Sequence, residues 1–340
     1  MIRVVSVIIA FWFCVPEAQA QNDSIRDTYI QQFPDKFFIW PVIKKREISF
    51  DLNSRDDKGK KLSYKPNTSF SAGLGFYIFE IAAEVTVAVP IDERSRTTYG
   101  TSDARDLQAN FLGKRWGIDV YTQKYSGFYV PNPNQTPTSP DLFIKRSDIE
   151  LRNTGANVRY VFNKDRFSQR SAYNYSERQL KSAGSFVLSG SLNTFNLHAD
   201  SAVLTQQVAP AISSTSTLKD FKYSAFSVAP GYSYSIIYKS FFLNGSFSLG
   251  PAHYWIQYTA PDQSTQYNIT LNTFADVRVS LGYNSEHFFG GMSLVTQTRD
   301  IRFDEIHFTN GTTAFKLLIG YRFPEVGILK KRAKDYLPSK

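Results

Sequence analysis

The sequence contains a single cysteine, Cys14, which lies in an apolar stretch at the N-terminus. Removal of that stretch would leave a chain without a thiol, which excludes disulfides and cysteine-based metal sites. The histidines are few and scattered, at His198, His253, His287 and His307. No metal-binding, phosphate-binding, dinucleotide-binding or hydrolase motif occurs. The sequence therefore predicts neither a metal centre nor a cofactor.

Long apolar runs are equally scarce, and mean hydropathy is −0.30. The run Val4–Val15 is too short to cross a bilayer as a helix. Arg3 precedes this run and Ala18–Gln19–Ala20 follows it, which is the order of basic, apolar and small residues in a secretory signal peptide. Residues 1–20 are therefore predicted to be a cleaved signal for export.

Acidic residues are in the minority, with 30 Asp and Glu against 39 Lys and Arg, and the formal charge is +9. This excess favours anionic partners, such as the phosphates of lipopolysaccharide or a small anionic solute. No nucleic-acid-binding motif accompanies the charge, so the sequence predicts no nucleic-acid partner.

The most frequent pattern in the sequence is the alternation of apolar and polar residues along the chain. From Thr273 to Tyr283 every second residue is apolar or Thr, whereas Asp276 and Arg278 belong to the opposite set. About twelve segments of this kind, each roughly 9–16 residues long, occur between residues 48 and 323. A period of two is typical of a strand whose two faces meet different surroundings. The sequence therefore predicts an all-β protein of about twelve antiparallel strands.

The connections between these segments alternate between short and long. The short ones are Tyr77–Glu80, Gly113–Trp116, Lys239–Phe241 and Asn284–His287, and the long ones are Pro90–Asp103, Ser126–Ser147, His198–Phe221 and Pro261–Tyr267. Short periplasmic turns and long extracellular loops are typical of an outer-membrane meander. Asn163–Lys181 breaks the scheme, and we expect it to hold a short plug or an extra helix.

Alternating strands fit either a soluble barrel with an apolar interior or a membrane barrel with an apolar exterior. The charges favour the second, because all of them fall on the polar face and a cation facing lipid would cost about 2–4 kcal/mol. The predicted lumen-facing charges are Glu80, Glu84, Asp119, Arg159, Asp276, Arg278, Arg299, Lys316 and Arg322. The apolar sets, including Ile48, Phe50 and Leu52, are then predicted to face outward. The fold class is a transmembrane up-and-down antiparallel β-barrel.

Aromatic residues gather on the apolar face beside the short turns. The predicted membrane-interface set is Phe79, Trp116, Tyr238, Phe241, Tyr283, Phe288, Tyr321 and Phe323. Amphipathic rings concentrate at membrane–water interfaces. A second girdle near the loops would include Trp255 and Phe303. Pro230 and Pro251 lie inside strand patterns, where each removes a ladder donor, and we expect them to mark bulges.

These features predict four parts. Residues 1–20 form the signal peptide, 21–46 a periplasmic N-terminal segment, 47–323 the outer-membrane barrel and 324–340 a basic periplasmic tail. The last strand, Phe315–Phe323, ends in aromatic residues like the signal read by the barrel assembly machinery. That machinery and the outer-membrane lipid, with its lipopolysaccharide, are the expected partners.

Three segments carry a family resemblance: Tyr64–Ile81, Asp103–Tyr129 and Asn157–Tyr173. They resemble an uncharacterised Bacteroidota-type outer-membrane family known as domain-of-unknown-function family 4421. The resemblance covers nearly the whole mature chain. It implies a barrel in the outer membrane and implies no catalytic or binding residues.

Several functions remain open from the sequence. Mixed charges in the interior would either pair and fill a structural barrel or line a narrow channel for a small solute. A membrane-embedded hydrolase would use His253 as a base with a serine such as Ser248. An adhesion or complex-assembly module would use the loops Ser126–Ser147 and His198–Phe221. No spacing indicates a catalytic residue, and we expect a monomer.

Overall fold

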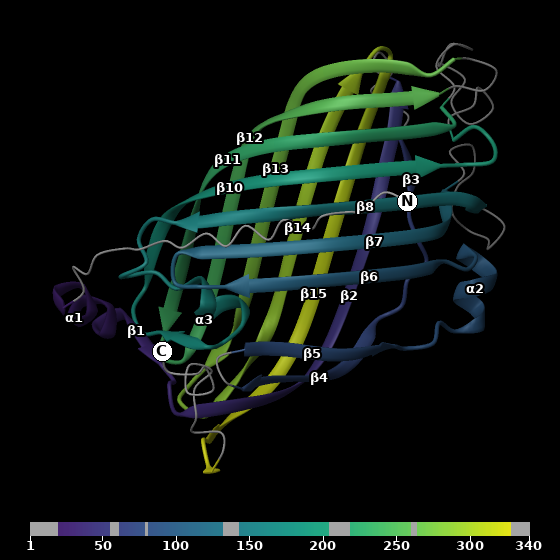
Figure 1. Ribbon diagram of the computed structural model, residues 1–340. Helices are drawn as coiled ribbons and strands as arrows, with labels where there is room; N and C mark the ends of the chain where they lie inside the picture. The colour runs from purple at the N-terminus through teal and green to yellow at the C-terminus, as the bar shows by residue number, and fades with distance from the viewer. Residues whose placement is uncertain are drawn as a thin grey trace, which may run out of the picture.

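A computed structural model describes residues 20–54, 61–78, 81–131, 143–203, 218–259 and 264–327. Strands dominate it and form one curled antiparallel sheet (Figure 1). The strands of this wall are β2 (Lys36–Ser54), β4 (Ser71–Ile78), β5 (Ile81–Ala88), β6 (Asp103–Leu112), β7 (Trp116–Pro131), β8 (Phe143–Val161), β10 (Ala183–His198), β11 (Asp220–Tyr238), β12 (Phe241–Thr259), β13 (Gln266–Asn284), β14 (Phe288–Phe303) and β15 (Ile306–Pro324). No helix among the described residues is long and apolar enough to cross a bilayer.

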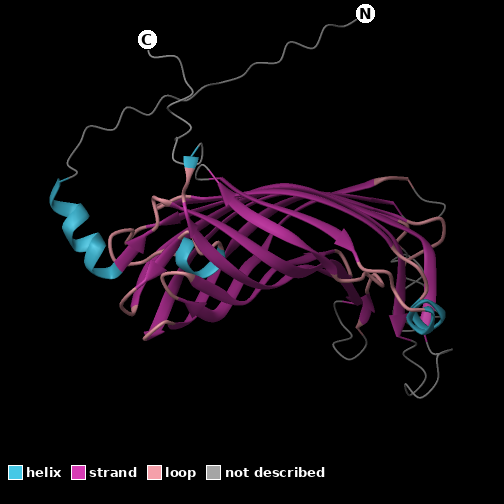
Figure 2. Cartoon of the chain, turned by 90° about the horizontal axis from the view of Figure 1, so that it is seen from below, coloured by secondary structure: helices cyan, strands magenta, loops and turns pink. Residues whose placement is uncertain are grey.

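The smaller elements lie at the two ends of the sheet (Figures 1 and 2). At the end with the short turns are α1 (Ala20–Tyr29), β1 (Ile30–Gln32), α3 (Gln169–Tyr173) and β9 (Glu177–Gln179). At the end with the long loops are β3 (Leu62–Tyr64) and α2 (Glu93–Tyr99). Both ends of the barrel therefore carry segments that are not part of its wall.

The wall strands pair with their neighbours in the sequence, and the first strand pairs with the last. The pairing order is β5-β4-β2-β15-β14-β13-β12-β11-β10-β8-β7-β6, which is twelve strands, and β3 pairs with β2 as a thirteenth. The predicted antiparallel up-and-down barrel of about twelve strands is thus confirmed. The ring has one interruption, because β5 and β6 end this order and are not paired with each other.

The wall begins earlier than the sequence pattern indicated. We expected the barrel to begin at residue 47, but β2 begins at Lys36 and pairs with β15 along its length. Pro41 concealed the first half of this strand, because proline cannot donate to the ladder. The ladder omits Pro41 and continues in the same register from Ile39 to Val42.

The other strand prolines behave in the same way. The ladder between β11 and β12 is interrupted around Pro230 and Pro251 and resumes in an unchanged register, so neither proline marks a bulge. The register shift lies in β7 between Ser126 and Phe128. Gly127 between them has a φ of 78°, which favours glycine, and an added Cβ would lie 2.3 Å from a backbone oxygen.

Polarity reverses halfway along the barrel. In the half next to the short turns, here the turn-side tier, outward side chains such as Leu243 and Ile319 are apolar and exposed. In the half next to the loops, the loop-side tier, apolar side chains lie inside instead. On β2 the side chains of Ile48, Phe50 and Leu52 are 0% exposed. Their predicted outward orientation is wrong, because a period of two groups residues by face without telling which face is inside.

The interior of the loop-side tier is a large aromatic core. Its aromatic members are Phe50, Tyr64, Tyr125, Phe128, Phe195, Phe221, Tyr223, Tyr254, Phe274, Phe303 and Phe308. Phe221 and Phe308 are typical, with ring centroids 4.5 Å apart. Phe303 is 2% exposed, so its predicted place in an outer girdle is wrong, whereas Trp255 does face outward. This core occupies the interior of the loop-side tier, between the loops and the charged residues of the turn-side tier.

Candidate functional site

The turn-side tier contains a buried network of four charged side chains. Asp119 lies on β7, Arg159 on β8, and Asp276 and Arg278 on β13. Each takes an inward position of an alternating strand. In the pairing order β10, β11 and β12 separate β8 from β13, so these side chains meet across the interior of the curled sheet.

Asp276 is the centre of this network. Its carboxylate accepts bonds from Arg159 Nη2 at 2.9 Å and from Arg278 Nε at 2.9 Å. Gln297 Nε2 donates to its other oxygen at 2.8 Å, and Arg278 also lies 3.3 Å from Asp119. The two arginines and two aspartates balance in charge. Asp276 is 1% exposed, so removing one partner would leave an uncompensated buried charge.

A second group surrounds Glu84 on β5. Its carboxylate lies 3.2 Å from Lys316 and 3.6 Å from Lys44, and Trp40 Nε1 donates to it at 3.2 Å. Lys44 and Lys316 are direct cross-strand neighbours, so Glu84 offsets their repulsion. Sequence reasoning missed Lys44 and Trp40, because residues 21–46 were assigned to a segment before the barrel.

Another ion pair crosses the interruption in the wall. Arg46 on β2 lies 2.8 Å from Asp106 on β6, and Gln123 donates to the same carboxylate at 2.9 Å. β2 and β6 are not paired strands. The Arg46–Asp106 pair and an isolated backbone bridge between Lys65 and Tyr129 therefore connect the two sides of the gap, where β5 and β6 form no ladder.

The turn end of the barrel is filled by the long connection that broke the turn scheme. It forms both α3 and β9, and β9 pairs with β1 of the N-terminal segment. Arg26 forms a buried ion pair with Glu177 at 2.7 Å. The wall holds this plug through Ser280, which donates to Ala172 O at 2.7 Å, and Asn244, which accepts from Tyr173 at 2.7 Å.

Two further arginines are fully buried and separate from the network. Arg322 donates to the carbonyls of Ser285 and Tyr175 at 2.6 Å each, and the rings of Phe33, Phe38 and Phe289 surround its guanidinium. Arg299 lies below the aromatic core and donates to Ser191 at 2.9 Å. Both terminal nitrogens of Arg322 thus have acceptors, whereas Nη1 of Arg299 has none among the described residues.

The structure brings together only some of the nine predicted charges. Asp119, Arg159, Asp276 and Arg278 form one network, Glu84 and Lys316 form another, and Arg299 and Arg322 lie apart. Glu80 and the predicted interface residue Phe79 lie outside the described residues. The aromatic core was not predicted. The connection Asn163–Lys181 was expected to hold a short plug or an extra helix, and it contains the helix α3. A signal for the core was present in β2, where the outward set changes from apolar Ile39 and Ile43 to polar Lys45, Glu47 and Ser49 while Ile48 and Phe50 on the inward set are apolar.

The described interface candidates lie on the outer surface near the short turns. Tyr238, Phe241 and Phe288 are the most exposed, at 69%, 59% and 60%. Rings on neighbouring strands are in contact: Trp116 with Tyr160, Phe241 with Tyr283, and Phe288 with Tyr321. Tyr321 also contacts Phe323 on its own strand. These contacts form an outward belt of aromatic rings around the turn end.

The candidates for a hydrolytic pair do not meet. Ser248 is buried inside the barrel, whereas His253 lies on the outward set of β12 and packs against Trp255. The described residues contain no group of three His, Cys, Asp or Glu placed to hold a metal ion.

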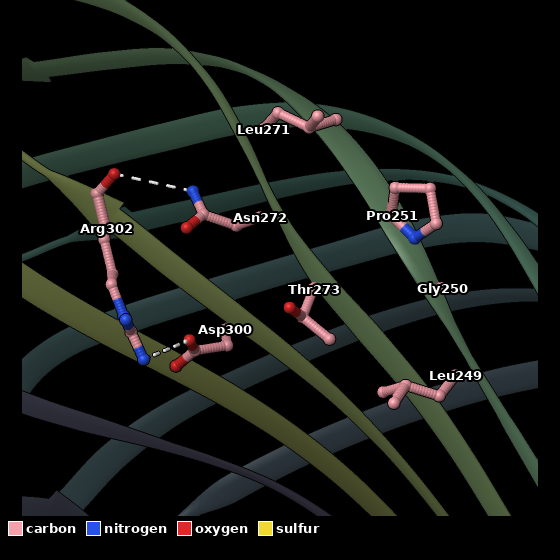
Figure 3. A pocket seen from close by; sticks show the side chains of 8 residues that line it. All are labelled: Leu249, Gly250, Pro251, Leu271, Asn272, Thr273, Asp300 and Arg302. Carbon is pink, nitrogen blue, oxygen red and sulfur yellow. Dashed lines mark hydrogen bonds and ion pairs between the residues drawn. The ribbon is translucent and has the colours of Figure 1, made fainter.

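An open hollow lies on the outside of the wall where β13 diverges from β14 (Figure 3). The ladder between these strands ends at Thr273 and Asp300, and Asp300 pairs with Arg302 at 3.2 Å. Leu249, Pro251 and Leu271 supply its apolar side (Figure 3). The hollow contains none of the interior charges, so the buried network remains the candidate site.

The fold and its interior define the chain as an antiparallel β-barrel protein with a filled, charged interior. It belongs to the family described as domain of unknown function DUF4421, whose family model matches residues 21–323. The predicted family resemblance is thereby confirmed. No curated protein matches the sequence.

Solved structures similar to this chain are bacterial surface barrels. The attachment invasion locus protein Ail of Yersinia pestis, in complex with the heparin analogue sucrose octasulfate, has 11% identity and a TM-score of 0.20 over 85% of this chain and 99% of Ail. The translocator domain of the autotransporter NalP from Neisseria meningitidis has 6% identity and a TM-score of 0.30 over 85% of this chain and 88% of NalP.

Proposed function

We propose that the protein is an integral outer-membrane β-barrel whose turn-side tier spans the bilayer. The outward apolar side chains of this tier support the proposal, since Phe186, Tyr238 and Ile319 are each more than half exposed. A continuous apolar surface of this kind is unfavourable in water and favourable in lipid. The aromatic belt then lies at the periplasmic interface, and the loop-side tier stands above the outer surface.

Within the membrane the barrel has a structural role and is closed along its axis. The observation that carries this proposal is the Arg159–Asp276 pair across the interior, which has the aromatic core on one side and the plug on the other. Inward serines and asparagines such as Ser189, Ser233 and Asn244 are buried rather than solvated. The barrel anchors the loop-side tier and its loops instead of conducting solutes.

Planar-bilayer recording of the refolded protein tests this role. We expect no stepwise conductance from the natural sequence, and none from Arg278→Glu if that variant still inserts. Heat-modified mobility in detergent gels provides the control for insertion. Stepwise currents whose ion selectivity changes in Arg278→Glu would favour the narrow solute channel and overturn the structural role.

An outer-membrane location also implies how the chain is exported and inserted and which lipid it meets. Export by the signal peptide, insertion through the last strand by the barrel assembly machinery, and contact between the basic chain and lipopolysaccharide follow from an outer-membrane location. An adhesion or assembly role would act through the long loops, of which residues 132–142, 204–217 and 261–263 lie outside the described residues.

A second candidate function is lateral exchange of amphipathic molecules between the bilayer and the interior. The interruption between β5 and β6 favours this function, because the backbone edges of these two strands are not paired with each other. Asp106, Gln108 and Asn110 lie on the inward set of β6 beside this gap. A molecule with a polar head and an apolar tail would match that polar strip and the lipid outside it.

A further inference from the structure

Arg299 on β14 carries a buried charge for which the protein supplies little compensation. It is 1% exposed, and its Nη2 donates to Ser191 Oγ at 2.9 Å and to Tyr121 OH at 3.5 Å. Nη1 has no hydrogen-bond partner. The ring of Phe274 covers the guanidinium at 5.0 Å. A charged donor that is withdrawn from water and left unbonded is strongly disfavoured.

The interior aspartates Asp119 and Asp276 pair with arginines other than Arg299. Asp276 is engaged by Arg159, Arg278 and Gln297. The groups that act electrostatically on Arg299 are the hydroxyls of Tyr121, Tyr223 and Tyr254. Among the described residues no carboxylate is paired with it.

Two residues near Arg299 also have buried polar atoms without a hydrogen-bond partner among the described residues. Asn310 on β15 is the direct cross-strand partner of Arg299, is 0% exposed, and has no hydrogen-bond partner for either Nδ2 or Oδ1. The hydroxyl of Tyr223 is also buried and unpartnered. Arg299 Nη1 thus has an unpartnered donor directly across the ladder, at Asn310, and another at Tyr223, which acts on it electrostatically. Buried donors without partners are rare in a folded protein unless a ligand or water completes them.

We propose that Arg299, Asn310 and Tyr223 hold a small monovalent anion inside the barrel, of which chloride is the simplest. Arg299 Nη1 supplies the charge, and Asn310 Nδ2 and the Tyr223 hydroxyl supply further hydrogen bonds. A water molecule would satisfy the bonds but leave the charge uncompensated in an interior of low dielectric constant. The anion is a structural ligand at the boundary between the aromatic core and the charged network.

Thermal unfolding of the full chain in detergent tests the site, with chloride compared with gluconate at equal ionic strength. We expect chloride to raise the Tm by about 2–4 °C, because a ligand that binds only the folded state stabilises it. Crystals grown in bromide should show anomalous scattering beside Arg299 Nη1. Equal Tm values in the two salts, or water density in place of bromide, would overturn the proposal.

Two variants separate the site from general salt effects. Asn310→Asp places a carboxylate beside Arg299, so we expect a folded barrel whose Tm no longer depends on chloride. Arg302→Gln lies on the outward set of the same strand and should retain the dependence. A chloride effect that persists in Asn310→Asp would contradict the assignment. The bromide experiment on the natural sequence remains decisive if this variant does not fold.

Discussion

At the scale of single residues, the arrangement of the interior depends on which carboxylates the buried arginines are paired with. Asp276 is shared by Arg159 and Arg278, and Gln297 completes its bonding. An ion pair in such a site adds little stability over apolar side chains of similar volume, but breaking it is expensive. The network therefore fixes how β8 and β13 face each other more than it raises overall stability.

Asp276→Asn tests the contribution of the shared carboxylate. The substitution leaves two buried arginines without their shared carboxylate, and we expect it to lower the free energy of unfolding by about 3–5 kcal/mol. Equilibrium urea unfolding in detergent or lipid vesicles measures the loss. Asp103→Asn removes an exposed partner of Arg105, whose side chain is 81% exposed, and should cost less than about 1 kcal/mol. Similar small losses in both variants would show that the network is not desolvated.

At the scale of the strand, a wall strand crosses two environments. β15 places Phe315, Leu317 and Ile319 on the outward set of the turn-side tier, and His307 and Thr309 on the same set near the loops. A membrane crossing needs about 9–11 tilted residues. Strands of 19 residues, such as β12 and β15, have enough length for a lipid-facing half and a water-facing half.

Arginine substitutions on the outer surface test this division. Leu243→Arg places a cation in the apolar band of the turn-side tier, where we expect a loss of about 2–4 kcal/mol of unfolding free energy in lipid vesicles. Thr309→Arg adds the same side chain to the outward set of the loop-side tier and should change stability by less than about 1 kcal/mol. Equal losses at the two sites would mean that the two tiers meet the same surroundings.

The geometry of a strand also decides how much of the fold and of the candidate site the sequence can predict. Period two correctly separates Val158 and Tyr160 from Arg159, because neighbouring side chains point to opposite faces. It cannot assign the inside of the barrel, which is why Phe50 was misplaced. Nor can it predict the contact between Arg159 and Asp276, which lie 117 residues apart and meet only through sheet curvature and strand number. The plug has no repeating pattern, so the sequence predicts only that Asn163–Lys181 holds a short plug or an extra helix and gives none of its contacts.

At the scale of the whole molecule, the interruption between β5 and β6 is the feature that the barrel architecture does not explain. Unpaired backbone groups are costly in lipid, since no water is available to bond them. Arg46 and Asp106 join the two sides through a side-chain pair, and Lys65 forms one isolated backbone bridge to Tyr129 of β7. A side-chain pair and a single bridge hold strands less firmly than a continuous ladder, so opening of the wall is best tested at this interruption.

A disulfide across the gap tests whether this opening has a function. With Cys14 replaced by Ala, we would introduce Thr86→Cys on β5 and Gln108→Cys on β6, both on inward sets. Oxidation should join the two strands when they approach to about 6 Å between Cα atoms, and reductant should release them. If the gap admits amphipathic molecules, oxidation should abolish uptake of a fluorescent amphipath by cells or proteoliposomes carrying the protein. A Val279→Cys and Leu294→Cys pair joins strands that are already paired and should leave uptake unchanged. Uptake that continues in the fully cross-linked β5–β6 variant would exclude lateral exchange and leave the structural role of the barrel.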